Sequence, residues 1–414
     1  MTTAPASGGR LLAGPPLTAG AESLGDHAHR LGPLPSSTRG LIQALDKSGL
    51  LGRGGAGFPV ARKWAAVAHA GGADPAILVN GAEGEPLSAK DRTLMAARPH
   101  LVLDGAQLAA QAVGARDIVL YVGEGYTDAR RAVQRAIEER RSGNGRVRTH
   151  LVAAPEAFVA GEETAAVHYI NDGDARPTSK PPRPFERGIG GRPTLVHNVE
   201  TLAHVALIAR HGEEWHRSAG RGQTRGTTLV TLQHGGQAFV SEIEYGTRVG
   251  DAVGAQGVPP SAAQAVLLGG YHGTWLRRED AWALPLDPAT LRAASVTLGT
   301  GVIGLLPYGA CGVASSARIT DYLAAQSAAQ CGPCVFGLRS IADAMLRLAG
   351  GSGSPDDLAR IEGWTALLSG RGGCRHPDGA AVMIGSALAA FTDDFAAHSR
   401  RRGCVARQQP AVAA

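Results

Sequence analysis

The residues best suited to chemistry are five cysteines, all in the last quarter of the chain: Cys311, Cys331, Cys334, Cys374 and Cys404. In a cytosolic chain of 414 residues, clustered cysteines indicate metal binding more than disulfides. Cys331 and Cys334 form a C-x2-C pair, and Cys374 begins a later C-x-H. Taken in isolation, this pattern is also typical of a zinc site.

A second chemical feature is a glycine-rich loop in residues 48–64, which read SGLLGRGGAGFPVARKW. Gly52, Gly54 and Gly57 fit the dinucleotide-binding pattern G-x-G-x-x-G, and the glycines allow the backbone to approach a phosphate or a flat ring. A Rossmann fingerprint needs a strand before the loop, whereas residues 38–48 have helical periodicity. We therefore expect a cofactor loop of another kind, with Arg53 and Lys63 as its positive charges; a flexible turn is the alternative.

Polar residues also follow expected strands or begin expected helices. Asn80, Glu83 and Glu85 come directly after a buried strand, where α/β proteins place their ligands. Glu162 and Glu163 stand at the start of a helix, a position that the helix dipole alone also favours. Residues 197–201 (HNVET) form another corner between a strand and a helix.

The elements that must position these residues change in type along the chain. Strands are expected at 76–79, 118–122 and 147–153, with helices at 126–141 and from 161, which indicates an α/β domain. Short β-type runs follow up to residue 305, and helices are expected at 314–328, 335–347, 355–368 and 379–398. We expect a disordered leader at 1–34, an α/β domain at 35–225, a small α+β domain at 226–305, a helical domain at 306–398 and a solvated tail at 399–414.

Charge and hydropathy exclude two classes of partner. The net charge is +5, from 41 basic and 36 acidic residues, and no basic stripe is interleaved with aromatics, so nucleic-acid binding is not expected. The longest apolar stretch, residues 380–391, is too short to span a bilayer. We expect a cytoplasmic protein that is at most peripheral to a membrane complex, with a weakly basic face suited to an acidic electron carrier.

Taken together, these stretches resemble the NADH-binding flavoprotein subunit of respiratory complex I and the related diaphorase subunits of soluble hydrogenases and formate dehydrogenases. The resemblance runs from Ser48 to Phe395 and rests on the glycine loop, NGAEGEPLSAKDR, GEETA, the KPP segment at Lys180, GRPTLVHNVETLAHV and QCGPC. It implies an FMN-binding α/β domain that is not a Rossmann fold, a β-grasp (soluble-ligand-binding) domain and a C-terminal helical bundle with a 4Fe–4S cluster.

The resemblance also implies a chemistry, hydride transfer from NADH to FMN followed by single-electron transfer to the cluster. Glu85 and Glu163 fall at nicotinamide-nucleotide positions and are the expected catalytic residues. The remaining cofactor-binding residues implied by the resemblance are Gly52, Arg53, Gly54, Gly55, Gly57, Lys63, Asn80, Glu83, Gly161, Glu162, Lys180 and Asn198.

The nucleotide site departs from the family pattern. Ala82 replaces an aspartate beside the flavin, and Phe158 replaces a tyrosine. Two phenylalanines that stack on adenine in the family correspond to Ala66 and Arg183 here. Each lost ring removes about 1–3 kcal/mol of stacking and burial, although an arginine can stack in partial compensation. The FMN site is therefore expected to be intact and the NADH site to be changed.

The cysteine pattern departs too. In the resemblance Cys331 and Cys334 match the second and third cluster ligands and Cys374 the fourth, while Ala328 stands at the first. Because a 4Fe–4S cluster generally needs four protein ligands, Cys311 is our choice for the missing one. Ser327 and His376 are weaker substitutes, and zinc binding by Cys374 and His376 with the C-x2-C pair is the alternative.

Two functions remain open from the sequence. The first is an oxidoreductase subunit that passes electrons from NAD(P)H through FMN and a 4Fe–4S cluster to a ferredoxin, a complex-I-like subunit or a membrane redox protein. The second is a non-catalytic FMN-binding relay or assembly subunit that no longer uses NADH.

Overall fold

A four-stranded parallel sheet organises the first half of the computed structural model, which describes residues 9–70, 74–141, 147–402 and 404. Its strand order is β3-β2-β1-β4, and every neighbouring pair is parallel. The strands are β1 (Ala76–Gly81), β2 (Asp117–Gly123), β3 (Arg148–Ala154) and β4 (Thr194–Asn198). Since a parallel arrangement brings the carboxyl ends of all strands to one edge, the polar residues after β1 and β4 meet there.

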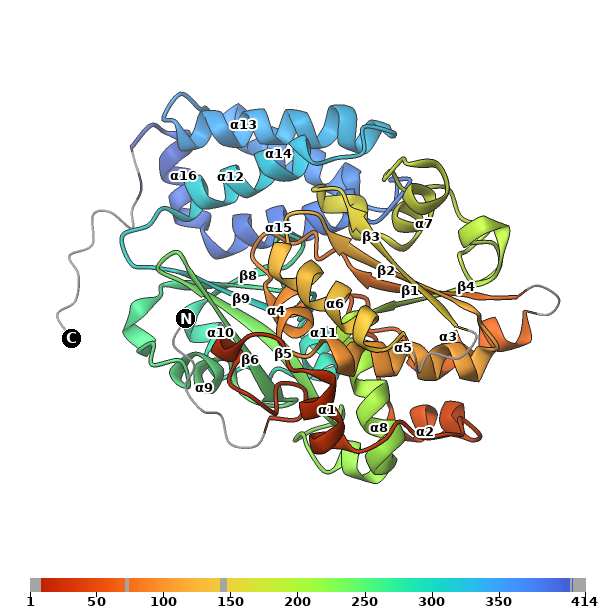
Figure 1. Ribbon diagram of the computed structural model, residues 1–414. Helices are drawn as coiled ribbons and strands as arrows, with labels where there is room; N and C mark the ends of the chain where they lie inside the picture. The colour runs from red at the N-terminus through yellow and green to blue at the C-terminus, as the bar shows by residue number, and fades with distance from the viewer. Residues whose placement is uncertain (1–8, 71–73, 142–146, 403, 405–414) are drawn as a thin grey trace.

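Helices cover both faces of this sheet (Figure 1). Alternate side chains of β1 point to opposite faces, so Ile77 and Val79 pack in the large core with α5 and α8, whereas Leu78 packs with α7. The helices of this half are α1 (Leu24–Leu31), α2 (Leu41–Ser48), α3 (Val60–His69), α4 (Lys90–Ala97), α5 (Pro99–Val113), α6 (Thr127–Glu139), α7 (Glu163–Asp172) and α8 (Val199–Arg217).

A second, mixed sheet follows with the order β6-β5-β9-β7-β8. Its strands are β5 (Thr227–His234), β6 (Gln237–Glu244), β7 (Ala265–Leu268), β8 (Thr274–Arg277) and β9 (Val302–Leu306), with the short helices α9 (Val249–Gly254), α10 (Arg278–Ala281) and α11 (Pro288–Ala293). β5 pairs antiparallel with β6 but parallel with β9, as expected for the small α+β domain. The domain boundaries given above remain our proposal.

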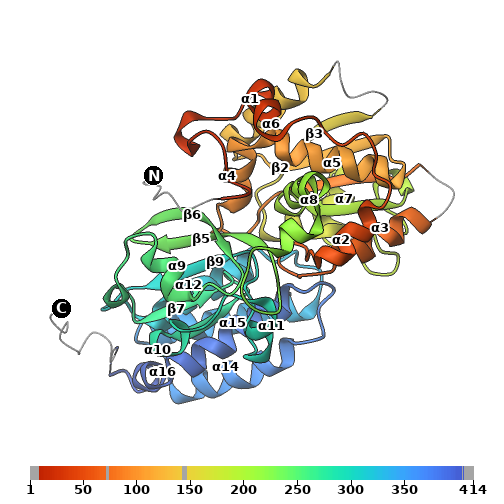
Figure 2. The same ribbon diagram turned by 90° about the horizontal axis from the view of Figure 1, so that it is seen from below.

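The C-terminal part is helical and packs over the second sheet (Figures 1 and 2). Its elements are α12 (Gly312–Ala325), a π-helical turn (Pro333–Leu338), α13 (Arg339–Ala349), α14 (Pro355–Leu368), α15 (His376–Ala390) and α16 (Thr392–Ser399). The single helix expected at 379–398 is in fact two helices bent by 85° at Phe391, whose backbone leaves the helical region. By length and composition alone, this bent pair is long and apolar enough to span a membrane, whereas no single helix in the described ranges is.

The disordered leader expected at 1–34 is wrong for residues 9–34; residues 1–8 lie outside the described residues. Leu11 is fully buried, and the buried Arg98 donates hydrogen bonds to the carbonyls of Leu12 (3.0 Å), Ala13 (2.8 Å) and Pro15. His27 of α1 lies 2.7 Å from Asp104 of α5. Sequence periodicity missed this segment because distant side chains, not its own pattern, satisfy its backbone.

Arg98→Ala is expected to release this segment. The substitution leaves several buried carbonyls without their hydrogen-bond donor, and each unsatisfied carbonyl costs about 1–3 kcal/mol. The free energy of unfolding should therefore fall by roughly 2–4 kcal/mol. Urea unfolding measures that loss, and trypsin should cut faster after Arg10 and Arg30. The control is Arg176→Ala, because Arg176 pairs with Asp174 at the surface; equal cleavage of the two variants would contradict the anchoring role of Arg98.

Candidate functional site

The glycine loop connects α2 to α3, and no strand precedes it. Gly52 N donates to Phe58 O (2.9 Å), which closes the loop at its base. Gly55 and Gly57 have φ of 103° and 60°, conformations that favour glycine. A Cβ at Gly54 would lie 3.6 Å from the Cβ of Asn198, so the loop lies against the end of β4. The structure thus confirms that this motif is not a Rossmann turn.

Arg53 is buried, and its side chain is held by neighbouring groups of the protein. Its guanidinium donates to the carbonyls of Leu51 (2.9 Å) and Thr227 (3.0 Å), and its Nε lies 3.5 Å from Glu200 Oε1. Its backbone N–H donates to Thr201 Oγ1 (2.9 Å). These contacts show that Arg53 shapes the loop, while its expected role as a positive charge toward a phosphate stays a prediction, because Arg53 also lines the cavity beside the loop.

Sequence reasoning missed a buried charge network behind the loop. Lys90 Nζ lies 2.7 Å from Asp91 and 2.9 Å from Glu200, and all three side chains are buried. Burial alone would lower the pKa of Lys90, but the neighbouring carboxylates outweigh it and raise that pKa, so the ammonium stays charged. Asp91 and Asn198 are joined by a 2.6 Å hydrogen bond, which ties the network to the end of β4. The sequence signals that could have revealed this network are the polar motifs KDR at 90–92 and NVET at 198–201, which contain its members.

A cavity of about 190 Å³ opens beside the loop, between it and the second sheet. Gly52, Gly55 and Gly57 line it on one side, and the segment 296–301 lines it on the other, with Arg53, Lys90 and Arg292 as cations. Lys63, Asn80, Gly161, Glu162 and Asn198 do not line this cavity. The structure therefore divides the expected cofactor residues between this cavity and the edge of the parallel sheet.

At that edge, the end of β1 meets the turn before α7. Asn80 Nδ2 donates to Gly161 O (2.8 Å), and a Cβ at Gly84 would lie 2.3 Å from Phe158 O, so glycine is required there. Glu83 has a positive φ of 32°, a strained conformation that occurs preferentially at functional sites. Its carboxylate accepts hydrogen bonds from Ser88 and from the N–H groups of Asp91 and Arg92 in the first turn of α4, so the carboxylate is held at that helix.

Four charged side chains form a chain of ion pairs across the start of α7. Lys63 Nζ lies 3.0 Å from Glu163 Oε2, while Lys180 Nζ lies 2.7 Å from Glu162 Oε1 and 3.8 Å from Glu163 Oε1. Glu162 also caps α7 by accepting from Thr164 N (2.7 Å). Burial raises the pKa of Glu163, but Lys63 and Lys180 lower it by more, so the carboxylate is ionised.

Glu85 lies apart from this chain, against the second sheet. Its carboxylate accepts from Tyr271 N (2.8 Å) and Leu87 N (3.2 Å), and its residue exposure is 6%. Burial raises the pKa of Glu85 to about 7, with the nearby Glu83 raising it further. A carboxyl group that titrates near neutrality is suited to holding or releasing a proton.

Three cysteines converge near the start of α7. Burial and then the adjacent Cys331 and Cys374 raise the pKa of the Cys334 thiol to about 12. The pKa of Cys374 is raised by burial, raised also by Glu162 and lowered by Lys180, which places this thiol beside the ion-pair chain. Within the described chain, the three sulfurs do not form a set spaced within 4.8 Å, so they are too widely spaced for one ion.

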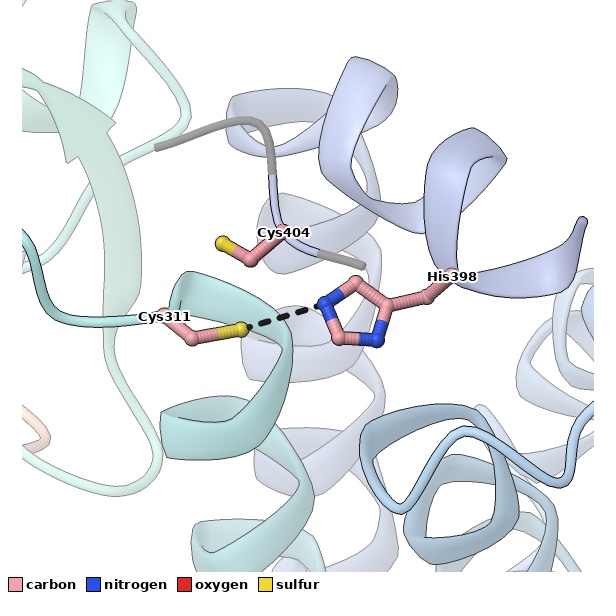
Figure 3. Close-up of side chains that lie close together, drawn as sticks. All are labelled: Cys311, His398 and Cys404. Atoms are coloured by element: carbon pink, nitrogen blue, oxygen red, sulfur yellow. Dashed lines mark hydrogen bonds between the residues drawn. The ribbon is translucent and has the colours of Figure 1, made fainter. Parts of the chain in front are cut away.

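Cys311 does not belong to this group, and its expected role as the missing ligand is wrong. It caps the first turn of α12, whereas Cys331 follows the last turn. Fourteen helical residues separate the two ends, a length of about 21 Å. Cys311 contacts His398 and Cys404 instead (Figure 3). Cys404, expected in a mobile tail, is buried.

His376 does not form, with the three thiols, a set of ligand atoms within 4.8 Å of one another in the described chain. Its Nε2 is 2.8 Å from Leu323 O, and its ring packs against Phe158 and His272. This aromatic cluster joins the α/β half, the second sheet and the helical part at one place. The zinc site considered for Cys374 and His376 is not supported by this arrangement.

Comparison with known proteins identifies two family regions. Residues 45–207 match the Nuo51 FMN-binding domain, and residues 314–398 match the NADH-ubiquinone oxidoreductase-F iron-sulfur binding region. The chain is 31% identical to an NADH-quinone oxidoreductase subunit of Rhizobium meliloti (strain 1021), over 88% of this chain and 90% of that protein. It is 30% identical to an NADH-quinone oxidoreductase subunit of Streptomyces coelicolor, over 88% and 84% of the two chains.

Solved structures agree with this result. An air-oxidized NAD⁺-reducing [NiFe]-hydrogenase chain superposes with a TM-score of 0.83 at 28% identity, covering 97% of this chain and 72% of that one. The H₂-reduced state gives a TM-score of 0.80 at 29% identity and covers 88% of this chain. This chain spans 63% of the length of that hydrogenase chain. The α/β, β-grasp and helical architecture is thereby confirmed.

The residues present fit FMN well, and they supply three of the four ligands that a 4Fe–4S cluster generally needs. Glycines with positive φ leave the loop open to a phosphate or ring, and the edge of the parallel sheet faces it. The grouped thiols Cys331, Cys334 and Cys374 are soft anionic ligands suited to iron. Of the five cysteines, the other two lie together elsewhere, so the fourth ligand is not a cysteine of this chain.

The cysteine positions predict which substitutions remove iron. Cys331→Ser and Cys374→Ser should each lose most of the iron and acid-labile sulfide, because each removes one of only three thiolates. Cys311→Ser should keep both at the wild-type level, because Cys311 lies at the far end of α12. Iron and sulfide analysis of anaerobically purified protein measures this; loss of iron in Cys311→Ser would return Cys311 to the cluster.

Proposed function

Because the chain belongs to the family of NADH-quinone oxidoreductase subunits that carry the Nuo51 FMN-binding domain, we propose that it is a diaphorase-type subunit that takes electrons from NADH and passes them to a redox partner. When bound, FMN accepts a hydride and gives single electrons to the cluster. The observation that carries the proposal is the ion-pair chain at the start of α7. It supports the proposal because Glu162 and Lys180, which belong to the proposed nucleotide site, lie within electrostatic reach of Cys374.

The residues of this chain provide orientation and charge. Lys63, held by Glu163 and by the Val196 carbonyl (3.1 Å), presents an ammonium group at the edge of the sheet. The ionised Glu163 accepts hydrogen bonds from the hydroxyl groups of the nucleotide. Lys180 remains between Glu162 and Glu163 and fixes both carboxylates.

Glu85 is the proton-holding group of the proposed site. Its two oxygens accept backbone N–H groups, which fixes the carboxyl at the contact between the β1 loop and the segment after β7. A Cβ at Gly270 would lie 2.5 Å from this carboxyl, so the contact is closely packed. A proton on this group near pH 7 can then be released when charge changes beside it.

The partner surface proposed here lies at the C-x2-C segment. Val335 and Phe336, directly after Cys334, are 39% and 73% exposed. Exposed apolar side chains beside a redox centre are typical of a surface that another subunit covers. We propose that a ferredoxin, or a redox subunit of a complex-I-like assembly, docks here and receives the electrons.

A second function is favoured by the changed adenine positions. Ala66 is half-buried and Arg183 is exposed, so neither offers an aromatic face. A subunit that holds FMN and relays electrons without oxidising NADH would need no such faces. Arg183 lies within electrostatic reach of Glu163, so it also offers a cation to a nucleotide phosphate, and NADPH belongs in the test.

Reduction of the bound flavin distinguishes these functions. With protein purified anaerobically, NADH or NADPH should bleach the flavin bands within the dead time of a stopped-flow mixer. Flavin that stays oxidised with both nucleotides, yet is reduced by dithionite, would contradict the diaphorase function and support the relay function.

The matched variants for this test are Glu163→Gln and Glu138→Gln. A hydrogen bond to a charged group contributes about 1.5–3 kcal/mol, so Glu163→Gln should slow reduction at limiting NADH roughly tenfold to a hundredfold. Glu138 is exposed on α6 and bonded to Gln134 only within its own helix, so its variant should retain the wild-type rate.

Glu85 gives the proposed site a pH dependence. Its folded-state pKa of about 7 lies above its ordinary value of 4.5, so its contribution to stability is fully present below pH 4.5 and is lost as the pH rises through 7. Urea unfolding between pH 5 and pH 8 should show wild type losing stability relative to Glu85→Gln. The rate of flavin reduction in Glu85→Gln should also lose its inflection near neutrality; identical profiles would contradict the assignment.

A further inference from the structure

Two cysteines and a histidine that the redox site does not use meet in the helical part. Cys311 caps the start of α12, His398 lies on α16 and Cys404 lies just beyond α16, and Figure 3 shows the three side chains close together, with Cys311 joined to His398. One ligand atom from each lies within 4.8 Å of the other two. The three residues are 7%, 7% and 6% exposed, so the cluster is buried.

The distances suit a single ion. Cys311 Sγ lies 3.4 Å from His398 Nε2. In a tetrahedral zinc site, with Zn–S of about 2.3 Å and Zn–N of about 2.0 Å, a sulfur and a nitrogen lie about 3.5 Å apart. The set is therefore close to coordination geometry before any ion is placed in it.

The histidine is oriented as a metal ligand. His398 Nδ1 lies 2.9 Å from the carbonyl of Leu348, which can only accept a hydrogen bond. Nδ1 therefore carries the proton, and the lone pair of Nε2 is directed at Cys311 Sγ. A backbone carbonyl that fixes the tautomer in this way is the usual outer partner of a metal-bound imidazole.

A fourth donor lies next to the set. Asp394 Oδ1 is 3.4 Å from Cys404 Sγ, and Asp394 is 8% exposed. Asp394 and His398 are four residues apart on α16, so they share one face of that helix. Its carboxylate lies outside the set of three whose ligand atoms are within 4.8 Å of one another, so it would supply the fourth donor through one water.

We propose that Cys311, His398 and Cys404, with Asp394 at the fourth position, bind one structural Zn²⁺. Two thiolates and an imidazole select zinc over the harder Mg²⁺ and Ca²⁺, and a buried site without an open face is structural. The ion links the start of α12, the end of α16 and the residue beyond it. It lies about 21 Å along α12 from the iron-binding thiols, so the two metal sites are independent.

Metal analysis of the full chain, expressed without a histidine tag in zinc-supplemented medium, tests this proposal. Wild type should contain about one zinc per chain in addition to its iron. Cys404→Ser and Cys311→Ser should each lose the zinc while keeping iron and flavin absorption. Cys331→Ser is the matched control and should do the opposite, keeping zinc and losing iron.

Two measurements on wild type keep the test decisive if a variant does not fold. Zinc-edge X-ray absorption should show two sulfurs at about 2.3 Å and lighter ligands at about 2.0 Å. Chelation should lower the Tm, and Zn²⁺ but not Mg²⁺ should restore it. Zinc-free protein from replete medium, zinc retained in Cys404→Ser, or a disulfide between Cys311 and Cys404 in freshly isolated protein would each overturn the site.

Discussion

The fold depends on one buried carboxylate, that of Glu200. It lies at the start of α8 without solvent exposure, and it accepts from Leu229 N (2.9 Å) and Thr228 Oγ1 (3.0 Å) of β5. Lys90 of α4 and Arg53 of the glycine loop are its cationic partners. One group therefore joins the loop, both sheets and two helices. Because removal of one member of a buried ion pair typically costs about 3–5 kcal/mol, the loop has little freedom to leave its position.

This constraint explains how a loop with several glycines acts as a defined site. Glycines at positive φ allow close approach but cost conformational entropy, and a flexible loop would lose any ligand geometry. Here the Arg53 side chain anchors the loop at the wall of the cavity, whereas Lys63 on α3 lies at the edge of the parallel sheet, where Glu163 holds it. Local sequence could not distinguish Arg53 from Lys63, because the direction in which a side chain points depends on tertiary contacts.

The sequence pattern predicted the features of the fold that depend on local sequence alone. β-branched runs located the first three strands to within two residues, and the motif-bearing corners at Asn80 and Asn198 were expected where they occur. The missed features all depend on distant partners. The leader is ordered by Arg98, Asp104 and Glu242, which no periodicity within residues 9–34 reveals. The bend at Phe391 was missed because helical periodicity continues through it, although the bend turns α16 toward the start of α12.

The same bend helps to explain why the five cysteines form two separate groups. Spacing alone made Cys311 the natural fourth ligand, since it precedes the C-x2-C pair by one helix. A 14-residue helix is a rigid spacer, however, and its two ends cannot share a cluster a few ångströms across. The helix instead separates the thiols beside Glu162 from the buried group of Cys311, His398 and Cys404. Redox chemistry and structural cross-linking thus use the two ends of α12, and a change at one end leaves the ligands at the other intact.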